Sequence, residues 1–126
     1  MLPLSARQTR HMKKTELDYF RKRVRYWQQR LGLCHFRVWV DAASLPDENG
    51  AQVHFGESAA KITINSDRKA TRKHMDKSAF HECMHLCIGD LEMLAKDRFV
   101  SEQEIDREVE RVVVRIESAF YGTELI

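Results

Sequence analysis

Residues 81 to 85 of the chain read His-Glu-Cys-Met-His, which is the pattern HExxH. Residues four apart lie on one face of an α-helix, so His81 and His85 can bind the same metal ion. Two imidazoles and a carboxylate suit Zn²⁺, which in catalytic sites has three protein ligands and an open position for water. Glu82 can act as general base toward that water. The pattern therefore predicts a catalytic zinc site.

The third zinc ligand cannot be a histidine further along the chain, because no histidine follows His85. The layout HExxHxxGxxH is therefore excluded. Gly89 and Asp90 are displaced by one residue from that layout, and Asp90 would have to replace the imidazole. A carboxylate from a later helix is the better source of the third ligand.

Glu108 is the predicted third ligand. It borders the apolar stripe expected on the last helix and lies 23 residues after His85, so it can point toward the neighbouring helix. Glu110 lies farther round that helix and is expected to face solvent, whereas Glu104 fits a capping role. The alternatives left open for the third ligand are Glu110, Glu104, Glu102 and Asp90.

The first half of the chain predicts one helix and three strands. Apolar residues at spacings of three and four indicate an amphipathic helix over residues 5–31, which Gly32 is expected to end. Alternating apolar and polar residues predict strands over 34–41, 51–56 and 60–65. Turn residues separate the first two strands, namely Pro46, Asn49 and Gly50. The apolar face of the helix consists of Leu17, Phe20, Val24, Trp27 and Leu31.

Two further helices are predicted in the second half. The HExxH helix is expected to begin between Thr71 and Asp76 and to end at Gly89, with Phe80, Cys83, Cys87 and Ala79 packed against the sheet. The last helix is expected to run from a capping box at Ser101 and Glu104 to Gly122. Its predicted apolar stripe is Ile105, Val109, Val112, Val113, Ile116 and Phe120. This order of elements predicts a single α+β domain over residues 1–126.

The segments FHECMHLCIGDLE (80–92) and EIDREVERVVVRIE (104–117) resemble the core of the gluzincins, zinc peptidases with HExxH on one helix and a glutamate ligand on the next. In its small size the chain is similar to the single-domain zincins of phages and mobile elements. The resemblance implies a minimal zincin-like fold that hydrolyses peptide bonds of a selected protein substrate. It also implies that His81, His85 and Glu108 bind zinc, that Glu82 is the general base, and that strand 60–65 is the edge strand that pairs with an extended peptide.

Composition limits the other classes of function. A chain of 126 residues with few glycines and prolines is suited to one compact core. It has no apolar run long enough to cross a membrane and no apolar stretch typical of a signal peptide, so we expect a cytoplasmic protein without a membrane partner. The three cysteines are an odd number and are expected to be reduced.

Charge is unevenly distributed along the chain. Residues 1–31 hold nine Lys and Arg against two Asp and Glu, whereas residues 89–126 hold five against ten. We expect the two terminal helices to attract one another. The alternative function is a catalytically inactive zincin-like module that binds a protein or nucleic acid through the basic first helix, around Arg21, Lys22, Arg23 and Arg25.

A peptidase also needs a donor that stabilises the oxyanion, beside any contribution of the metal. The sequence leaves this donor unassigned. His54, His74, Arg111 and Tyr121 are candidates by residue type, but His54 and His74 are expected to be solvated.

Overall fold

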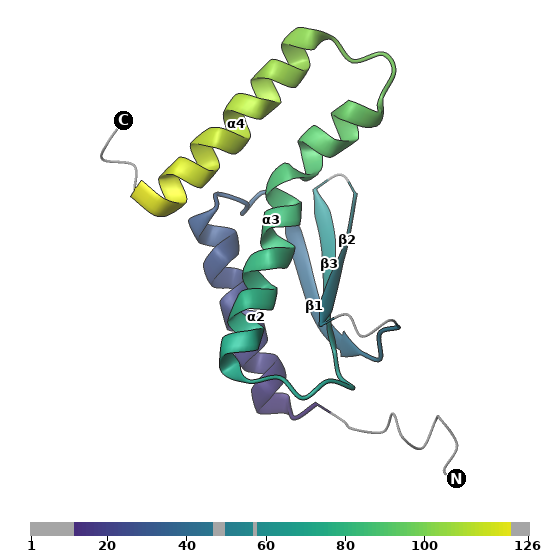
Figure 1. The fold of residues 1–126 in the computed structure, drawn as a ribbon, viewed down its shortest axis with the longest axis vertical. Helices are drawn as coiled ribbons and strands as arrows, with labels where there is room; N and C mark the ends of the chain where they lie inside the picture. Colours follow the sequence, from purple (N-terminus) through teal and green to yellow (C-terminus); the bar gives the residue numbers. More distant parts are fainter. Residues whose placement is uncertain (1–11, 47–49, 57, 122–126) are drawn as a thin grey trace.

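The computed structural model describes residues 12–46, 50–56 and 58–121, which form an α+β fold with three helices and a three-stranded mixed sheet (Figure 1). The order of elements is α2 (Lys14–Arg30), β1 (Arg37–Ala43), β2 (Ala51–Gly56), β3 (Ala59–Asn65), α3 (Arg72–Lys96) and α4 (Glu102–Tyr121). The predicted α+β class and the order of elements are confirmed, whereas the zincin-like identity of the fold stays a prediction. The expected helical residues 5–11, Asn49 and the stop at Gly122 lie outside the described residues. None of the described helices has the length and apolar character needed to cross a membrane.

The sheet has the strand order β1-β3-β2, so β3 is the central strand. It pairs in parallel with β1 and antiparallel with β2. The prediction that strand 60–65 is an edge strand is therefore wrong. A short hairpin, in which Ser58 has a φ of 59°, joins β2 directly to β3. Ala60, Ile62 and Ile64 of β3 are buried, so the most buried strand lies in the middle of the sheet, and β2 forms an edge.

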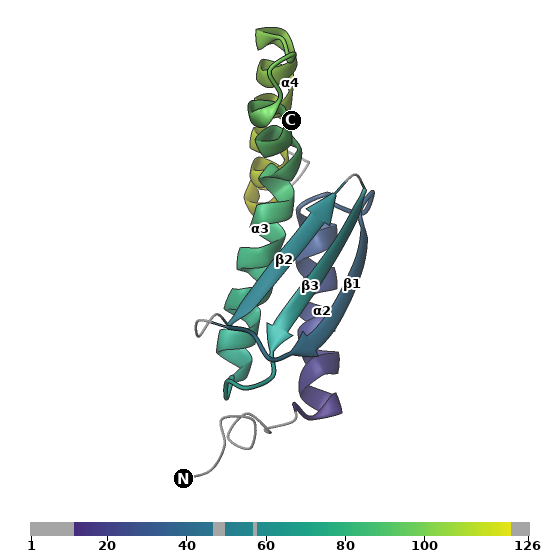
Figure 2. The ribbon, with the colours of Figure 1, turned by 90° about the vertical axis from the view of Figure 1, so that its right-hand side faces the viewer.

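The core lies between one face of the sheet and helices α2 and α3. Figure 2 shows both helices on the same side of the strands. Side chains from both helices and from the sheet are fully buried there, among them Phe20 of α2, Ile62 of β3 and Leu86 of α3. The predicted stop of α2 is also confirmed, because Gly32 has a φ of +68°, which a residue with a side chain rarely adopts.

Helix α3 does not end at Gly89 as predicted but continues to Lys96. Gly89 lacks the positive φ of a helix stop and is buried inside the helix. A Cβ atom at this position would lie 2.7 Å from Cε2 of Phe55 on β2. The absence of a side chain at Gly89 therefore permits close approach of α3 to β2. Glycine serves here to make room for packing and not to adopt a positive φ.

Helix α4 begins as predicted, but its buried face differs from the predicted stripe. The backbone N–H of Glu104 donates to the Ser101 hydroxyl over 3.2 Å, which confirms the N-terminal cap. The buried side chains are Glu108, Val112 and Ala119, whereas Val109, Val113 and Phe120 are exposed. Among the described elements, α4 packs mainly on α3. Helix α3 alone cannot cover the whole apolar stripe of α4, so part of that stripe stays exposed.

The expected attraction between the terminal helices stays a prediction. No ion pair joins the described residues of α2 and α4, and Arg23 of α2 instead pairs with Asp76 of α3 over 2.6 Å. The cysteine face of α3 is buried as expected, in the core cluster that α2, β3 and α3 share. Cys83 Sγ lies 3.6 Å from the Val24 carbonyl oxygen.

Candidate metal centre

His81, Glu82 and His85 come together on two successive turns of α3. One potential ligand atom from each of these side chains lies within 4.8 Å of the others, and the two imidazole rings are 5.0 Å apart. Both histidines are exposed, whereas Glu82 is buried. The described residues thus contain a His-Glu-His group that can hold a metal ion.

The neighbours of α3 fix the direction of this group. On the side of the helix toward β2, Ser78 lies close to Gly50 and Gly89 contacts Phe55. On another side, Phe80 packs against Trp27 of α2 at a ring distance of 4.7 Å. The two histidines lie on the part of the helix that these contacts leave open to solvent. The helix therefore holds both imidazoles on its accessible face.

Glu82 is the unusual member of the group. Its side chain is 5% exposed, and its Oε2 atom is buried with no hydrogen-bond partner. Burial raises the pKa of the carboxyl group, while His81 and His85 oppose that rise. A buried carboxylate oxygen normally has a partner, because leaving it unsatisfied costs about 1–3 kcal/mol. A ligand or a water beside the histidines would satisfy it.

A small pocket of about 240 Å³ opens beside Glu82 and His81. Its other walls are Gly50 and Ala51, at the start of β2, and Lys77 and Ser78 on α3. The pocket therefore connects the metal-binding group with the edge strand of the sheet. Sequence reasoning missed Lys77, although the signal was present: Lys77, His81 and His85 are spaced by four and share one helical face.

Glu108 is buried on α4, but the structure does not include it in the group formed by the histidines. It pairs with Arg111 one turn later, and its Oε2 atom has no partner. Phe120 contacts Phe80 of α3, and Nη1 of Arg115 lies 3.4 Å from the Cys87 carbonyl oxygen, so the two helices are antiparallel.

The antiparallel arrangement decides where Glu108 lies along α3. It precedes Arg115 by seven residues, which corresponds to about 10 Å of helix at 1.5 Å per residue. Glu108 therefore lies beyond Cys87, nearer the connection between the helices than His85. Its role as third ligand stays a prediction.

The remaining candidates of the sequence are separate from the pocket. His54 and His74 are exposed, as expected, and lie on β2 and in the first turn of α3. Tyr121 and Arg111 are exposed on α4. Glu110 is exposed as predicted, and Glu104 accepts a hydrogen bond from the Ser101 hydroxyl at the cap.

The two cysteines of α3 belong to the core, as predicted. Cys83 and Cys87 are fully buried, and burial raises the pKa of the Cys83 thiol to about 12. A thiol held in its neutral form is a weak metal ligand and a weak nucleophile. Neither cysteine lies in the His81, Glu82 and His85 group.

No known family model matches the chain, and it shows no significant similarity to a curated protein or to a solved structure. The donor set therefore has to be judged by its own chemistry. Two imidazoles with a neighbouring carboxylate match the nitrogen and oxygen ligands that Zn²⁺ accepts, and the partnerless Glu82 oxygen fits a bound water or ligand. The residues present fit a zinc ion.

Proposed function

We propose that the chain is a zinc-dependent peptidase with Glu82 as its general base. The observation that carries the proposal is the grouping of His81, Glu82 and His85 within 4.8 Å, beside a pocket that adjoins an edge strand. His81 and His85 would hold the metal, with Glu108 as the predicted third ligand. The ion, when bound, would supply Lewis acidity that lowers the pKa of water and polarises a carbonyl group.

Glu82 suits the role of a base because its carboxylate lies next to the two histidines and has an oxygen without a hydrogen-bond partner. In the proposed reaction, this carboxylate takes a proton from the attacking water. It then gives the proton to the leaving amine as the peptide bond breaks. The low exposure of Glu82 supports the same role, because exclusion of bulk water strengthens proton transfer to a defined partner.

The substrate would be an extended peptide that pairs with β2. This strand pairs with β3 on one side, and no described strand occupies its other edge. Ala51, its first residue, lines the pocket that contains His81 and Glu82. A peptide added along β2 would gain backbone hydrogen bonds and bring a peptide bond toward the histidines. This assignment replaces the strand 60–65 that the resemblance had implied.

Lys77 would supply the donor that the sequence left unassigned. It lines the same pocket, one turn before His81, and its ammonium group is exposed. A positive charge there would stabilise the negative charge that develops on the carbonyl oxygen of the peptide. The Lys77→Gln substitution would then lower kcat while metal remains bound.

The test uses zinc-loaded protein and a library of peptides from digested cellular proteins, with new termini identified by mass spectrometry. The parent protein should generate a defined set of new termini. Glu82→Gln should generate none, because it keeps the shape of the side chain but removes the base. Both proteins should contain the same amount of zinc.

Two outcomes would contradict the proposal. If Glu82→Gln cleaved as fast as the parent, Glu82 would not be the base. If zinc-loaded parent and Glu82→Gln both produced no new termini from the library or from unfolded proteins, the inactive binding module would be the better interpretation.

A further inference from the structure

The outer face of the sheet, which points away from α2 and α3, carries an exposed tryptophan beside an arginine. No described helix covers this face in Figure 2. Trp39 of β1, Lys61 of β3 and His54 of β2 are paired in the sheet register and form one row across it. Trp39 is 57% exposed, and the Arg37 guanidinium lies 5.8 Å from the centre of its ring system. An exposed aromatic ring with a guanidinium beside it can serve as a stacking platform for an unpaired base.

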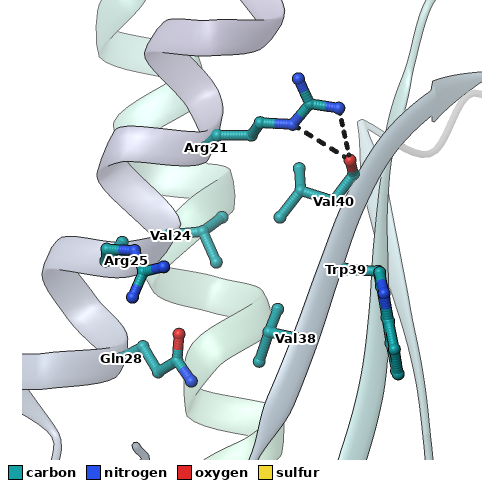
Figure 3. A pocket seen from close by; sticks show the side chains of 7 residues that line it. All are labelled: Arg21, Val24, Arg25, Gln28, Val38, Trp39 and Val40. Atoms are coloured by element: carbon teal, nitrogen blue, oxygen red, sulfur yellow. Dashed lines mark hydrogen bonds between the residues drawn. The ribbon is translucent and has the colours of Figure 1, made fainter.

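A basic groove continues from this face along the free edge of β1. A cavity of about 330 Å³ between α2 and β1 is lined by Arg21, Arg25 and Trp39 among others. A second cavity, of about 320 Å³, shares Arg25 and Trp39 and also contains Arg37. Figure 3 shows Arg21 reaching from α2 to the Val40 carbonyl oxygen of β1, to which its Nε and Nη2 donate over 3.3 and 3.1 Å.

The charges of this groove are not balanced. Two carboxylates near it, among the residues that the structure describes, are already paired: Asp18 lies 3.5 Å from Arg21, and Asp41 lies 3.2 Å from Lys61. Within the described part of the chain, neither Arg25 nor Arg37 forms an ion pair. Two guanidinium groups therefore stay available for an anionic partner, that of Arg37 beside the Trp39 ring and that of Arg25 on α2 across β1 (Figure 3).

We propose that the outer sheet face and the β1 groove bind single-stranded nucleic acid. Phosphates would lie against Arg25 and Arg37, and an unpaired base would stack on Trp39. Aromatic side chains beside a positively charged groove are the general means by which proteins hold single strands without reading their sequence. A duplex would not fit this arrangement, because its bases are stacked within the helix and cannot cover Trp39. The surface is separate from the His81 pocket, so the proposal does not depend on peptidase activity.

The test is fluorescence anisotropy of a labelled fifteen-residue oligothymidylate with the full chain, at increasing salt. The parent should bind, and Trp39→Ala should weaken binding about tenfold. The double variant R25Q/R37Q should reduce the slope of log K against log salt by about 1.4, the value for two lost phosphate contacts to a single strand. Circular dichroism would verify that the exposed substitutions leave the fold intact.

The matched control is the double variant K73Q/R98Q, which removes the same charge from exposed positions on α3 and on the connection to α4. It should keep the parental slope. The proposal is overturned if the parent does not bind, or if K73Q/R98Q and R25Q/R37Q weaken binding equally. It is also overturned if a duplex of equal length or an oligoglutamate competes as well as the single strand, since either would show attraction to any polyanion.

Discussion

Helices α3 and α4 are constrained by their neighbours to very different degrees. Helix α3 contacts α2 through Phe80 and Cys83, and β2 through Gly89. Helix α4 packs mainly on α3, and Val113 and Phe120 on its surface are about half exposed. The direction of side chains on α3 is therefore set from several sides. The direction of side chains on α4 is set by one neighbour, so its composition alone is a poor guide to which residues it buries.

The largest effect on stability is expected on α3, for truncation of Leu86, which is fully buried there. Leu86→Ala removes buried methyl groups and leaves a cavity, so we expect it to lower the free energy of unfolding by about 2–5 kcal/mol. Urea denaturation measures this change. A loss below 1 kcal/mol would show that α3 is not packed on several sides.

A smaller effect is expected at Gly89. Gly89→Val would place methyl groups against the Phe55 ring and should lower the free energy of unfolding by about 1–3 kcal/mol. Phe55→Ala makes room for the added groups, so the cost of Gly89→Val should be smaller in that background. If the two substitutions were additive in urea denaturation, contact with Phe55 would not be the reason for a glycine at this position.

The smallest effect is expected on α4. Val113→Ala removes two methyl groups that are already in contact with solvent, and it should change the free energy of unfolding by no more than about 0.5 kcal/mol. The same urea titration as for Leu86→Ala provides the measurement. A cost close to that of a buried valine would mean that a partner, such as a second copy of the chain, covers this side of α4 in solution.

The sequence was sufficient for the features that local chemistry determines. The spacing of His81 and His85 predicted a shared helical face, the Ser101 and Glu104 pattern predicted a cap, and Gly32 predicted a helix end. Each of these depends on residues within about one turn. The exposed positions of His54 and Glu110 followed from strand and helix periodicity, whereas His74 was expected in a basic loop and is exposed in the first turn of α3.

The predictions that were wrong concern features that depend on contacts between distant segments. Gly89 has the residue type of a helix stop, but its close contact with Phe55 becomes visible only when α3 is packed on β2. The position of β3 between β1 and β2 depends on pairing that strand periodicity does not specify. The level of Glu108 along α3 depends on the length of α3, which continues past the predicted stop. Because α3 continues to Lys96, the connection between α3 and α4 lies farther from His85. Glu108, which is near the start of α4, therefore also lies farther from His85.

The central claim is that α3 carries a zinc site, and the metal content of the purified protein tests it most directly. The parent, His81→Ala and Glu108→Ala should be prepared without a metal-binding affinity tag and measured by elemental analysis. We predict near-stoichiometric zinc in the parent and loss of zinc in His81→Ala. Loss in Glu108→Ala as well would establish Glu108 as the third ligand, whereas retained zinc would assign that position to another group. A parent that contains no zinc and takes up none on addition would contradict the account.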